Sequence, residues 1–315
     1  MDSSPNLLFH RIGLNVTKAL HSFRSSSQGL TKVSRFVTNR KLHRLAREHH
    51  AAGYPQMAIF SHDHIGHTIN IEGRYEDDYL RTAFGWLGGF LMNMDQLVAL
   101  DIGANIGNHS VFFSRYFREV HSFEPNPRTF ELLKFNAAQT ANVTAHRQGL
   151  SDADVVGTLR ENPTNMGGTF IEVDAQGARP GDNGAVSLST LDTFAADRAL
   201  GRVGFIKIDT EGFEARILRG ARSIIAANQP VIMFELSPSD FGPGGSEVFD
   251  LLSSLGYDFV SVERNFEFGE SRLGRYSGFL LRTLVGERLD VRSIGRIRPG
   301  FYQMIVAVHR DLRAI

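Results

Sequence analysis

The chain has 315 residues, of which 42% are hydrophobic and 22% are charged, and its 34 basic residues equal its 34 acidic residues. This composition is typical of a globular protein with a substantial core, and a net charge of zero argues against a nucleic-acid partner. The absence of cysteine excludes disulfides and Cys-ligated zinc or iron–sulfur centres, and no apolar run is long enough to span a membrane.

The first 50 residues are basic, rich in serine and almost free of acidic residues. Asp2 is the only acidic residue before Glu48, whereas nine lysines and arginines lie between Arg11 and Arg47. Leucines and phenylalanines between these bases predict helix, with a break at Ser25–Gly29. Three interpretations follow: a helical extension packed on the rest of the chain or on a second subunit of an oligomer, an interfacial helix on an anionic membrane, and an organelle transit peptide. The helical extension is the favoured one.

Two short apolar runs, Met57–Phe60 and His67–Ile71, predict the strands of a hairpin. Asp63 and a following glycine supply the turn chemistry between them. Imidazole is a common transition-metal ligand, so His62 and His64 beside Asp63 raise the hypothesis of a metal site. Because this stretch lies in a predicted turn remote from the strand ends of the sheet, an exposed polar turn is the favoured interpretation.

Beyond a predicted helix at 75–90, strands and helices alternate, which predicts a doubly wound, Rossmann-like α/β sheet of parallel βαβ units. The polar strand 143–149 is expected at an edge of this sheet. The stretch 162–184 is irregular, and its length favours a functional or partly stranded segment. The predicted strands are 97–100, 119–123, 143–149, 203–208, 231–236, 257–262, 279–282 and 303–308, and the helices between them are 108–117, 127–140, 214–227 and 246–255.

A glycine-containing loop, Asp101–Gly107, follows the first of these strands and precedes a helix that begins near Asn108. Gly103 and Gly107 can adopt backbone angles that a Cβ forbids, which lets a ligand lie against the main chain. The free N–H groups at the start of the helix favour a polar ligand. Loops at this place in doubly wound sheets bind nucleotide-like cofactors. Asn105 stands where the dinucleotide fingerprint needs its second glycine, which argues against an NAD-dependent dehydrogenase.

An acidic residue, Glu124, ends the second of these strands, seventeen residues after Gly107. A carboxylate beside the glycine loop is suited to accept both hydroxyls of a ribose. Pro125 and Pro127 restrict the backbone, so the chain turns sharply before the next helix. A solvated glutamate near a helix N-cap is the alternative, and the spacing favours the ribose contact.

Together these motifs resemble those of the FkbM-type methyltransferases, which use S-adenosylmethionine (SAM). The resemblance implies methyl transfer from SAM to a hydroxyl oxygen, and a seven-stranded, mostly parallel methyltransferase sheet with one antiparallel strand near the C-terminus. We expect an N-terminal helical and hairpin extension at 1–70 and a SAM-dependent methyltransferase domain at 71–315. The matching segments are 101–107, 123–127, 149–152, 191–194 and 206–214, within a likeness that covers about 71–262. Residues 72–76 also resemble the family, which implies that this segment lies over the cofactor.

The SAM contacts are expected from the loops that follow the first three strands. Ser151 and Asp152, after the third strand, are placed to reach an adenine edge, and a plain turn is the alternative. The expected cofactor-binding residues are Asp101, Gly103, Ala104, Asn105, Gly107, Asn108, Glu124, Pro125, Asn126, Ser151 and Asp152.

The expected catalytic residues are Lys207, Asp209 and Glu211, at the end of the predicted strand 203–208. Lys207 and Asp209 share a face of the strand, and a lysine inside an apolar strand needs a partner such as Asp209. In one interpretation this pair is structural. In the other, Asp209 or Glu211 orients the acceptor hydroxyl or removes its proton, while Lys207 tunes the local charge. A less favoured alternative has Asp209, Glu211 and Glu235 hold Mg²⁺, which would activate the acceptor.

The expected function is therefore O-methylation of a small molecule, sugar or glycolipid by a cytoplasmic enzyme. The basic N-terminal segment adds the hypothesis of peripheral membrane contact, and acceptor specificity is expected from that segment and from 162–184. The alternative from another class is a binding or scaffold protein that kept the fold but lost turnover. The intact Asp101, Gly103, Glu124 and Asp209 argue against it.

Overall fold

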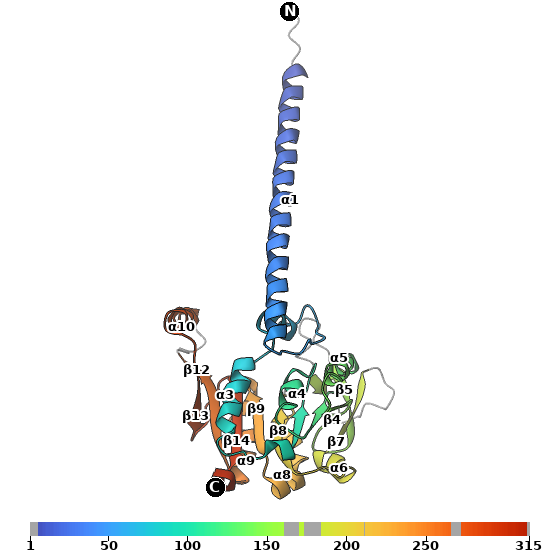
Figure 1. Cartoon of the computed structure of the whole chain (residues 1–315), viewed down its shortest axis with the longest axis vertical. Coiled ribbons are helices and arrows are strands. Elements are labelled where there is room, and N and C mark those ends of the chain that lie inside the picture. The colour runs from blue at the N-terminus through green and yellow to red at the C-terminus, as the bar shows by residue number, and fades with distance from the viewer. Residues whose placement is uncertain (1–5, 161–169, 173–183, 211, 266–271, 314–315) are drawn as a thin grey trace, which may run out of the picture. The chain divides into compact units, whose positions relative to one another are not determined.

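The computed structural model describes residues 6–160, 170–172, 184–210, 212–265 and 272–313 (Figure 1). Contacts between residues divide the chain into two compact units. The smaller unit ends at Tyr54 and also includes Asn70–Gly73, and the larger unit comprises Pro55–Ile69 and Arg74–Ile315.

Helix α1 (Asn6–Ala51) makes up most of the smaller unit. It runs without interruption, so the predicted break at Ser25–Gly29 is wrong (Figure 1). Serine and glycine each weaken a helix by about 1 kcal/mol or less relative to alanine. Proline, the much stronger helix breaker, is absent from this segment.

The predicted hairpin at 57–71 is also wrong. Residues 57–60 form no strand, and helix α2 (His64–Glu72) replaces the second predicted strand. The alternation of Ile69 and Ile71 with polar residues suggests a strand with one apolar face, but Ile71 is exposed in the structure. The buried residues of α2 are Gly66 and Ile69, three apart, which is a helical spacing. The short pattern fits both periods, and packing selects the helical one.

The larger unit contains a sheet of eight strands in the described part of the chain. They are β1 (Val98–Ile102), β2 (Glu119–Phe123), β3 (Val143–His146), β8 (Val203–Ile208), β9 (Val231–Leu236), β12 (Tyr257–Arg264), β13 (Leu289–Ile294) and β14 (Tyr302–His309). Their order across the sheet is β13-β12-β14-β9-β8-β1-β2-β3.

Strands β3, β2, β1, β8 and β9 run parallel to one another. Strand β14 runs antiparallel to both of its neighbours, and β13 runs antiparallel to β12. The predicted mostly parallel α/β sheet with an antiparallel strand near the C-terminus is therefore confirmed. The sheet has eight strands rather than the seven expected, because β13 adds a strand at one edge.

Helices of the larger unit accompany this sheet. They are α3 (Asp77–Leu87), α4 (Asn108–Phe113), α5 (Pro127–Ala137), α6 (Leu191–Ala196), α7 (Glu214–Arg219), α8 (Arg222–Asn228), α9 (Glu247–Ser254), α10 (Arg272–Val285) and α11 (Arg310–Arg313). The predicted helix 214–227 divides into α7 and α8 at Gly220, where a Cβ would lie 2.1 Å from the carbonyl oxygen of Ser151. The predicted strand 279–282 is wrong, because these residues belong to α10.

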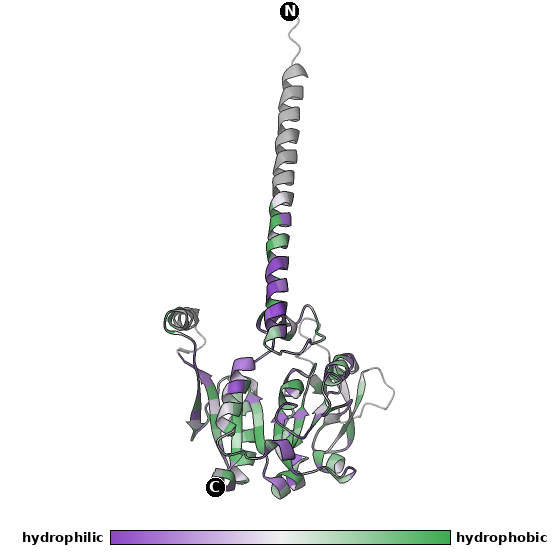
Figure 2. Cartoon of the chain, in the orientation of Figure 1, coloured by the Kyte–Doolittle hydropathy of each residue, from purple (hydrophilic) through white to green (hydrophobic). Residues whose placement is uncertain are grey.

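Apolar side chains pack on both faces of the sheet, and the strands are the most continuously hydrophobic part of the larger unit (Figure 2). Along β1, Leu100 and Ile102 join one buried cluster while Ala99 joins the other, as the alternation of a strand requires. Aromatic rings of α3 and β8 meet in the second cluster, where the ring centroids of Phe84 and Phe205 lie 5.4 Å apart. Burial on both faces explains why these strands read as continuous apolar runs.

A second sheet has the order β4-β7-β5-β6 and consists of β4 (Gly149–Leu150), β5 (Val155–Arg160), β6 (Phe170–Glu172) and β7 (Ala185–Ser189). Strand β6 lies inside the predicted irregular stretch 162–184, so its partly stranded character is confirmed. Residues 162–169 and 173–183 of that stretch lie outside the described residues. The predicted edge strand 143–149 is confirmed as β3 at the sheet edge, although it ends at His146. Short strands β10 (Phe241–Gly242) and β11 (Gly245–Ser246) and the 3-10 helices Met94–Gln96 and Pro238–Asp240 also belong to this unit.

Candidate active site

A cavity of about 220 Å³ lies at the carboxyl ends of β1, β2, β8 and β9. Strands β1 and β8 are neighbours that lead into opposite halves of the sheet, so the cavity occupies the switch point where α/β sheets bind ligands. All the residues that line it belong to the larger unit. Its polar lining residues are Asp63, His64, Tyr75, Glu76, Asn105, Glu124, Asn126, Thr129, Gln148, Asp209, Thr210 and Glu235.

The glycine loop after β1 is fixed by its own backbone. The N–H groups of Gly103 and Ala104 both donate to the carbonyl oxygen of Phe123, at 3.1 and 2.9 Å. Gly103 has a φ of 72°, and a Cβ on it would lie 1.8 Å from the carbonyl oxygen of Asp209. Only glycine permits this approach of the loop to the end of β8, so bare main chain forms part of the cavity wall.

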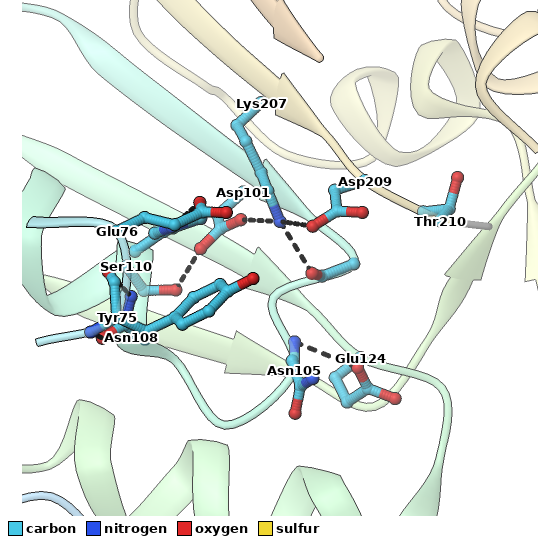
Figure 3. A network of polar contacts seen from close by, with 12 residues as sticks. Tyr75, Glu76, Asp101, Asn105, Asn108, Ser110, Glu124, Lys207, Asp209 and Thr210 are labelled. Atoms are coloured by element: carbon cyan, nitrogen blue, oxygen red, sulfur yellow. Dashed lines mark hydrogen bonds and ion pairs between the residues drawn. The ribbon is translucent and has the colours of Figure 1, made fainter. Parts of the chain in front are cut away.

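Glu124 projects from the end of β2 toward this loop (Figure 3). Its Oε2 atom accepts a hydrogen bond from the backbone N–H of Asn105 at 3.1 Å, and its Oε1 atom accepts one from Asn126 at 2.8 Å. Burial raises the pKa of Glu124 to about 7, although these two N–H donors act in the opposite direction. Each carboxylate oxygen has a second lone pair, which leaves Glu124 able to accept two further hydrogen bonds from a ligand.

Lys207 holds the ends of β1 and β8 together (Figure 3). Its Nζ atom donates to the carbonyl oxygen of Gly103 at 2.8 Å and lies 3.3 Å from Asp101 and 3.4 Å from Asp209. Burial opposes the charge on Lys207, but the two carboxylates raise its pKa above the ordinary value. The predicted pairing with Asp209 is confirmed, and Asp101 is an additional partner. Lys207 is therefore a permanently charged clamp, and it is unsuited to accept a proton.

Asp101 is fully buried behind the glycine loop. Its second carboxylate oxygen accepts a 2.5 Å hydrogen bond from the hydroxyl of Ser110, which in turn accepts one from Ser122 at 2.8 Å. Both carboxylate oxygens of Asp101 thus have partners, Lys207 and Ser110. Through Lys207, which also donates to Gly103, Asp101 helps to hold the glycine loop in place.

Glu76 is a site residue that the sequence analysis does not assign to catalysis or cofactor binding. It has a φ of 58°, an uncommon conformation for a residue other than glycine, and such strain concentrates at functional sites. Its carboxylate lies 3.0 Å from Nε2 of His109 and accepts a hydrogen bond from the side chain of Gln303. Burial opposes ionisation, yet His109 and Gln303 hold the pKa of Glu76 below its ordinary value. Glu76, Asp209 and Glu235 line both the cavity and a smaller hollow next to it.

Tyr75 is held against the start of α4. Its backbone N–H donates to the amide oxygen of Asn108 at 3.1 Å, and the amide nitrogen of Asn108 donates back to its carbonyl at 2.9 Å. Burial and the nearby carboxylates raise the pKa of the Tyr75 phenol well above its ordinary value. Tyr75 lines the cavity, and its hydroxyl is therefore neutral there.

Residues 63–65 form another part of the wall, which corrects a prediction. The backbone N–H of Ala58 donates to the amide oxygen of Asn136 at 2.7 Å. The amide nitrogen of Asn136 donates to the carbonyls of Ala58 and Ile106, at 2.9 and 2.7 Å. Asp63 is buried, and it lines the cavity together with His64. His62 and His64 are exposed and residues 61–62 form a turn, as predicted. The predicted remoteness from the strand ends is wrong, because Asp63 and His64 line the cavity and Asn136 connects the preceding residues to the glycine loop.

The predicted residues divide into those that line the cavity and those that support it. Gly103, Asn105, Glu124, Pro125, Asn126 and Asp209 line it, whereas Asp101, Ala104, Gly107, Asn108 and Lys207 do not. Ser151 and Asp152 also lie outside the lining, and residues 148–150 occupy that side instead. Asp152 is paired with Arg216 at 3.6 Å and with Arg219 at 3.2 Å. Glu211 lies outside the described residues.

Two features are absent from the described part of the chain. No group of three or more His, Cys, Asp or Glu side chains in that part is arranged to hold a metal ion. No helix there combines the length and the apolar character needed to cross a bilayer.

Comparisons with known proteins agree on one family. Residues 101–259, half of the chain, match the model of the methyltransferase FkbM domain. Hexuronic acid methyltransferase AglP of Haloferax volcanii is 26% identical over 176 residues, which cover 54% of this chain and 68% of AglP. The 31-O-demethyl-FK506 methyltransferase FkbM of Streptomyces tacrolimicus is 27% identical over 196 residues, which cover 53% of this chain and 74% of that protein.

Solved structures add more distant similarities. The crystal structure of methyltransferase FkbM from Methylobacillus flagellatus is 17% identical, with a TM-score of 0.34. The alignment covers 62% of this chain and 47% of that one, so the present chain spans about half the length of the Methylobacillus protein.

Proposed function

The chain belongs to the FkbM methyltransferase family, and we propose that it transfers the methyl group of SAM to a hydroxyl oxygen of a small molecule, sugar or glycolipid. The observation that carries this proposal is Glu124, a buried carboxylate at the end of β2 that faces the same cavity as the glycine loop. A carboxylate at this switch point is suited to accept the two ribose hydroxyls of a nucleoside.

The cavity suits SAM in two further respects. The main chain at Gly103 lies where a Cβ has no room, so the loop can contact a ligand directly. The backbone of Asn105 and Asn126 orients Glu124 through its two N–H donors. When bound, SAM supplies an electrophilic methyl group on a sulfonium that leaves as a neutral thioether. The protein's task is then to align the acceptor oxygen with that methyl group and to exclude water.

Asp209 is the residue we propose for the acceptor hydroxyl. Its side chain is 43% exposed and faces the cavity, and it lies 3.4 Å from Nζ of Lys207. A carboxylate there can orient the hydroxyl and take its proton during methyl transfer. Glu211 stays an alternative for this role, and a purely structural Lys207–Asp209 pair is the competing interpretation.

The acceptor class is proposed from the relatives. AglP is named a methyltransferase of hexuronic acid, and the Streptomyces protein is named for position 31-O of its substrate. These names support a sugar or small-molecule acceptor and an oxygen as the methylated atom. We also propose an N-terminal extension at 1–70 and a methyltransferase domain at 71–315. The proposed location is cytoplasmic, with peripheral membrane contact through the basic N-terminal segment. Mg²⁺ is not part of the proposal.

The direct test is calorimetric titration of the full chain with SAM, with and without Mg²⁺, and with NAD⁺ as a control. We expect micromolar SAM binding and no NAD⁺ signal. Glu124→Ala should weaken SAM binding by about tenfold to hundredfold through the lost ribose contact. Glu119→Ala, at the exposed start of the same strand, is the matched control and should bind normally.

Unchanged affinity in Glu124→Ala would remove the ribose assignment, and an absence of SAM binding by the wild type would contradict the proposal as a whole. Release of S-adenosylhomocysteine in the presence of hydroxylated acceptors then separates an enzyme from a non-catalytic SAM-binding protein.

A further inference from the structure

Helix α10 presents an apolar stripe to solvent. Leu273, Tyr276 and Leu284 are 81%, 76% and 73% exposed and are the three most exposed large apolar side chains among those described. Leu280, between them, is 59% exposed. Spacings of three, four and four residues place all four on one face of the helix. A contiguous exposed stripe of this kind marks a surface that binds something apolar.

A different face of α10 carries two glycines. Gly274 and Gly278, four residues apart, are both buried and, by their helical spacing, lie away from the stripe. The hydroxyl of Ser277, near the stripe, donates to the carbonyls of Leu273 and Gly274 at 2.9 and 3.0 Å. Because this hydroxyl is satisfied within the helix, its transfer to an apolar medium does not leave it without a hydrogen-bond partner.

The charge of this region selects the partner. The sequence of α10 contains three arginines and no acidic residue, and residues 272–298 contain seven arginines and only two acidic residues. The whole chain is electrically balanced, so this is a local concentration of positive charge. An anionic surface would compensate this charge, and an exposed apolar face in a helix that has basic residues and no acidic ones is the composition of interfacial helices.

We propose that α10 is an interfacial helix that binds the larger unit to an anionic lipid surface. Leu273, Tyr276, Leu280 and Leu284 enter the boundary between headgroups and acyl chains, and the helix lies parallel to the membrane. This contact is independent of the basic N-terminal segment, because α10 belongs to the unit that contains the cavity.

The test is co-sedimentation of the full chain with vesicles of phosphatidylcholine alone or with added phosphatidylglycerol. We expect binding to the anionic vesicles, weak binding to the neutral ones, and a loss of binding as salt is raised. The double variant Leu273→Gln/Leu280→Gln removes two stripe residues and keeps good helix formers, so it should fold and bind anionic vesicles about tenfold or more weakly. The matched control is Met92→Gln/Phe135→Gln, which changes two other exposed apolar residues and should bind like the wild type. Unchanged SAM affinity verifies that both variants are folded.

Three results would overturn the proposal. The first is a wild type that does not bind anionic vesicles. The second is equal binding by the wild type and the α10 variant, which would assign the contact to another surface such as α1. The third is a wild type that sediments as a dimer in the absence of lipid while the α10 variant is monomeric, which would make a second copy the occupant of the stripe.

Discussion

Glu124 is a buried carboxylate whose proposed contact with ribose hydroxyls is strongest when it is ionised. An isolated carboxylate loses its hydration on burial, and this loss raises the pKa of Glu124 to about 7 in the ligand-free protein. Ribose hydroxyls would restore the missing hydrogen bonds to the ionised form. The residue is therefore poised to ionise fully when the nucleoside arrives.

SAM affinity is accordingly expected to depend on pH through Glu124. As pH falls from 8 to 6, protonation removes acceptor capacity, so affinity should fall, whereas Glu124→Gln should bind weakly and without this dependence. Calorimetry at several pH values provides the measurement. A wild-type affinity that is flat over this range would contradict the assignment.

The same raised pKa has a consequence for folding. The contribution of Glu124 to stability is fully present below its ordinary value of 4.5 and is lost as pH rises through about 7. Thermal unfolding should show that Glu124→Gln gains more stability relative to the wild type at pH 8 than at pH 5. An equal difference at the two pH values would argue that burial does not disfavour the charge.

Asp209 should be separable from cofactor binding by mutation. Asp209→Asn keeps the size of the side chain but removes its basicity, so turnover should fall by about 100-fold or more while SAM affinity changes little. S-adenosylhomocysteine release and calorimetry measure the two quantities. The exposed Asp95 provides the control variant Asp95→Asn. Wild-type turnover in Asp209→Asn would return the Lys207–Asp209 pair to a structural role.

At the scale of elements, the sequence predicts the strands around the cavity well. Strands β1, β8 and β9 are mainly apolar and almost entirely buried, whereas β2 alternates buried residues with more exposed ones. Each of the four has a polar residue of the site at or directly after its end. The strand predicted within α10 is wrong because residues 279–281 form a short apolar run that fits a strand as well as a helix. The alternation at 67–71 fails for the same reason, since exposure of Ile71 depends on tertiary packing.

The part of the site that escapes the sequence comes from distant segments. Glu76 and Gln303 meet across 227 positions, and nothing in the local sequence indicates that contact or the positive φ of Glu76. Gly103 and Glu124 were predictable because each follows a recognisable strand, and sheet topology brings parallel strand ends together. Motifs at strand ends are thus readable, and the resemblance places 72–76 over the cofactor, whereas the contribution of residues 63–65 to the wall requires the folded chain.

The close approach of the glycine loop to the end of β8 gives a prediction about stability. In Gly103→Ala the new Cβ would collide with the Asp209 carbonyl and the backbone would be held at an unfavourable φ. We expect a loss of more than about 2 kcal/mol of stability, with SAM binding abolished. Gly85→Ala in α3 has open space and should be neutral or stabilising by about 0.5–1 kcal/mol. Denaturant unfolding distinguishes the two, and equal stability would show that the loop can shift.

For the whole molecule, the two-unit division assigns the cavity and α1 to different units. Every residue that lines the cavity belongs to the larger unit. A variant without residues 1–50 is therefore expected to bind SAM within about threefold of the full chain. Calorimetry on the shortened protein checks this, with a thermal melt as the control for folding. A large loss of affinity in a folded variant would show that α1 shapes the cavity.

The ammonium group of Lys207 contacts both the loop proposed to bind SAM and the residue proposed to bind the acceptor. It donates to the carbonyl of Gly103, in the loop proposed to hold SAM, and faces Asp209, proposed to meet the acceptor. A ligand that draws Asp209 away leaves more of this charge to the loop, and a ligand that moves the loop changes the field at Asp209. Binding of donor and acceptor is then cooperative in the thermodynamic sense, and each alters the affinity of the other by the same factor. An enzyme built in this way holds its methyl donor with a strength that depends on whether an acceptor is present.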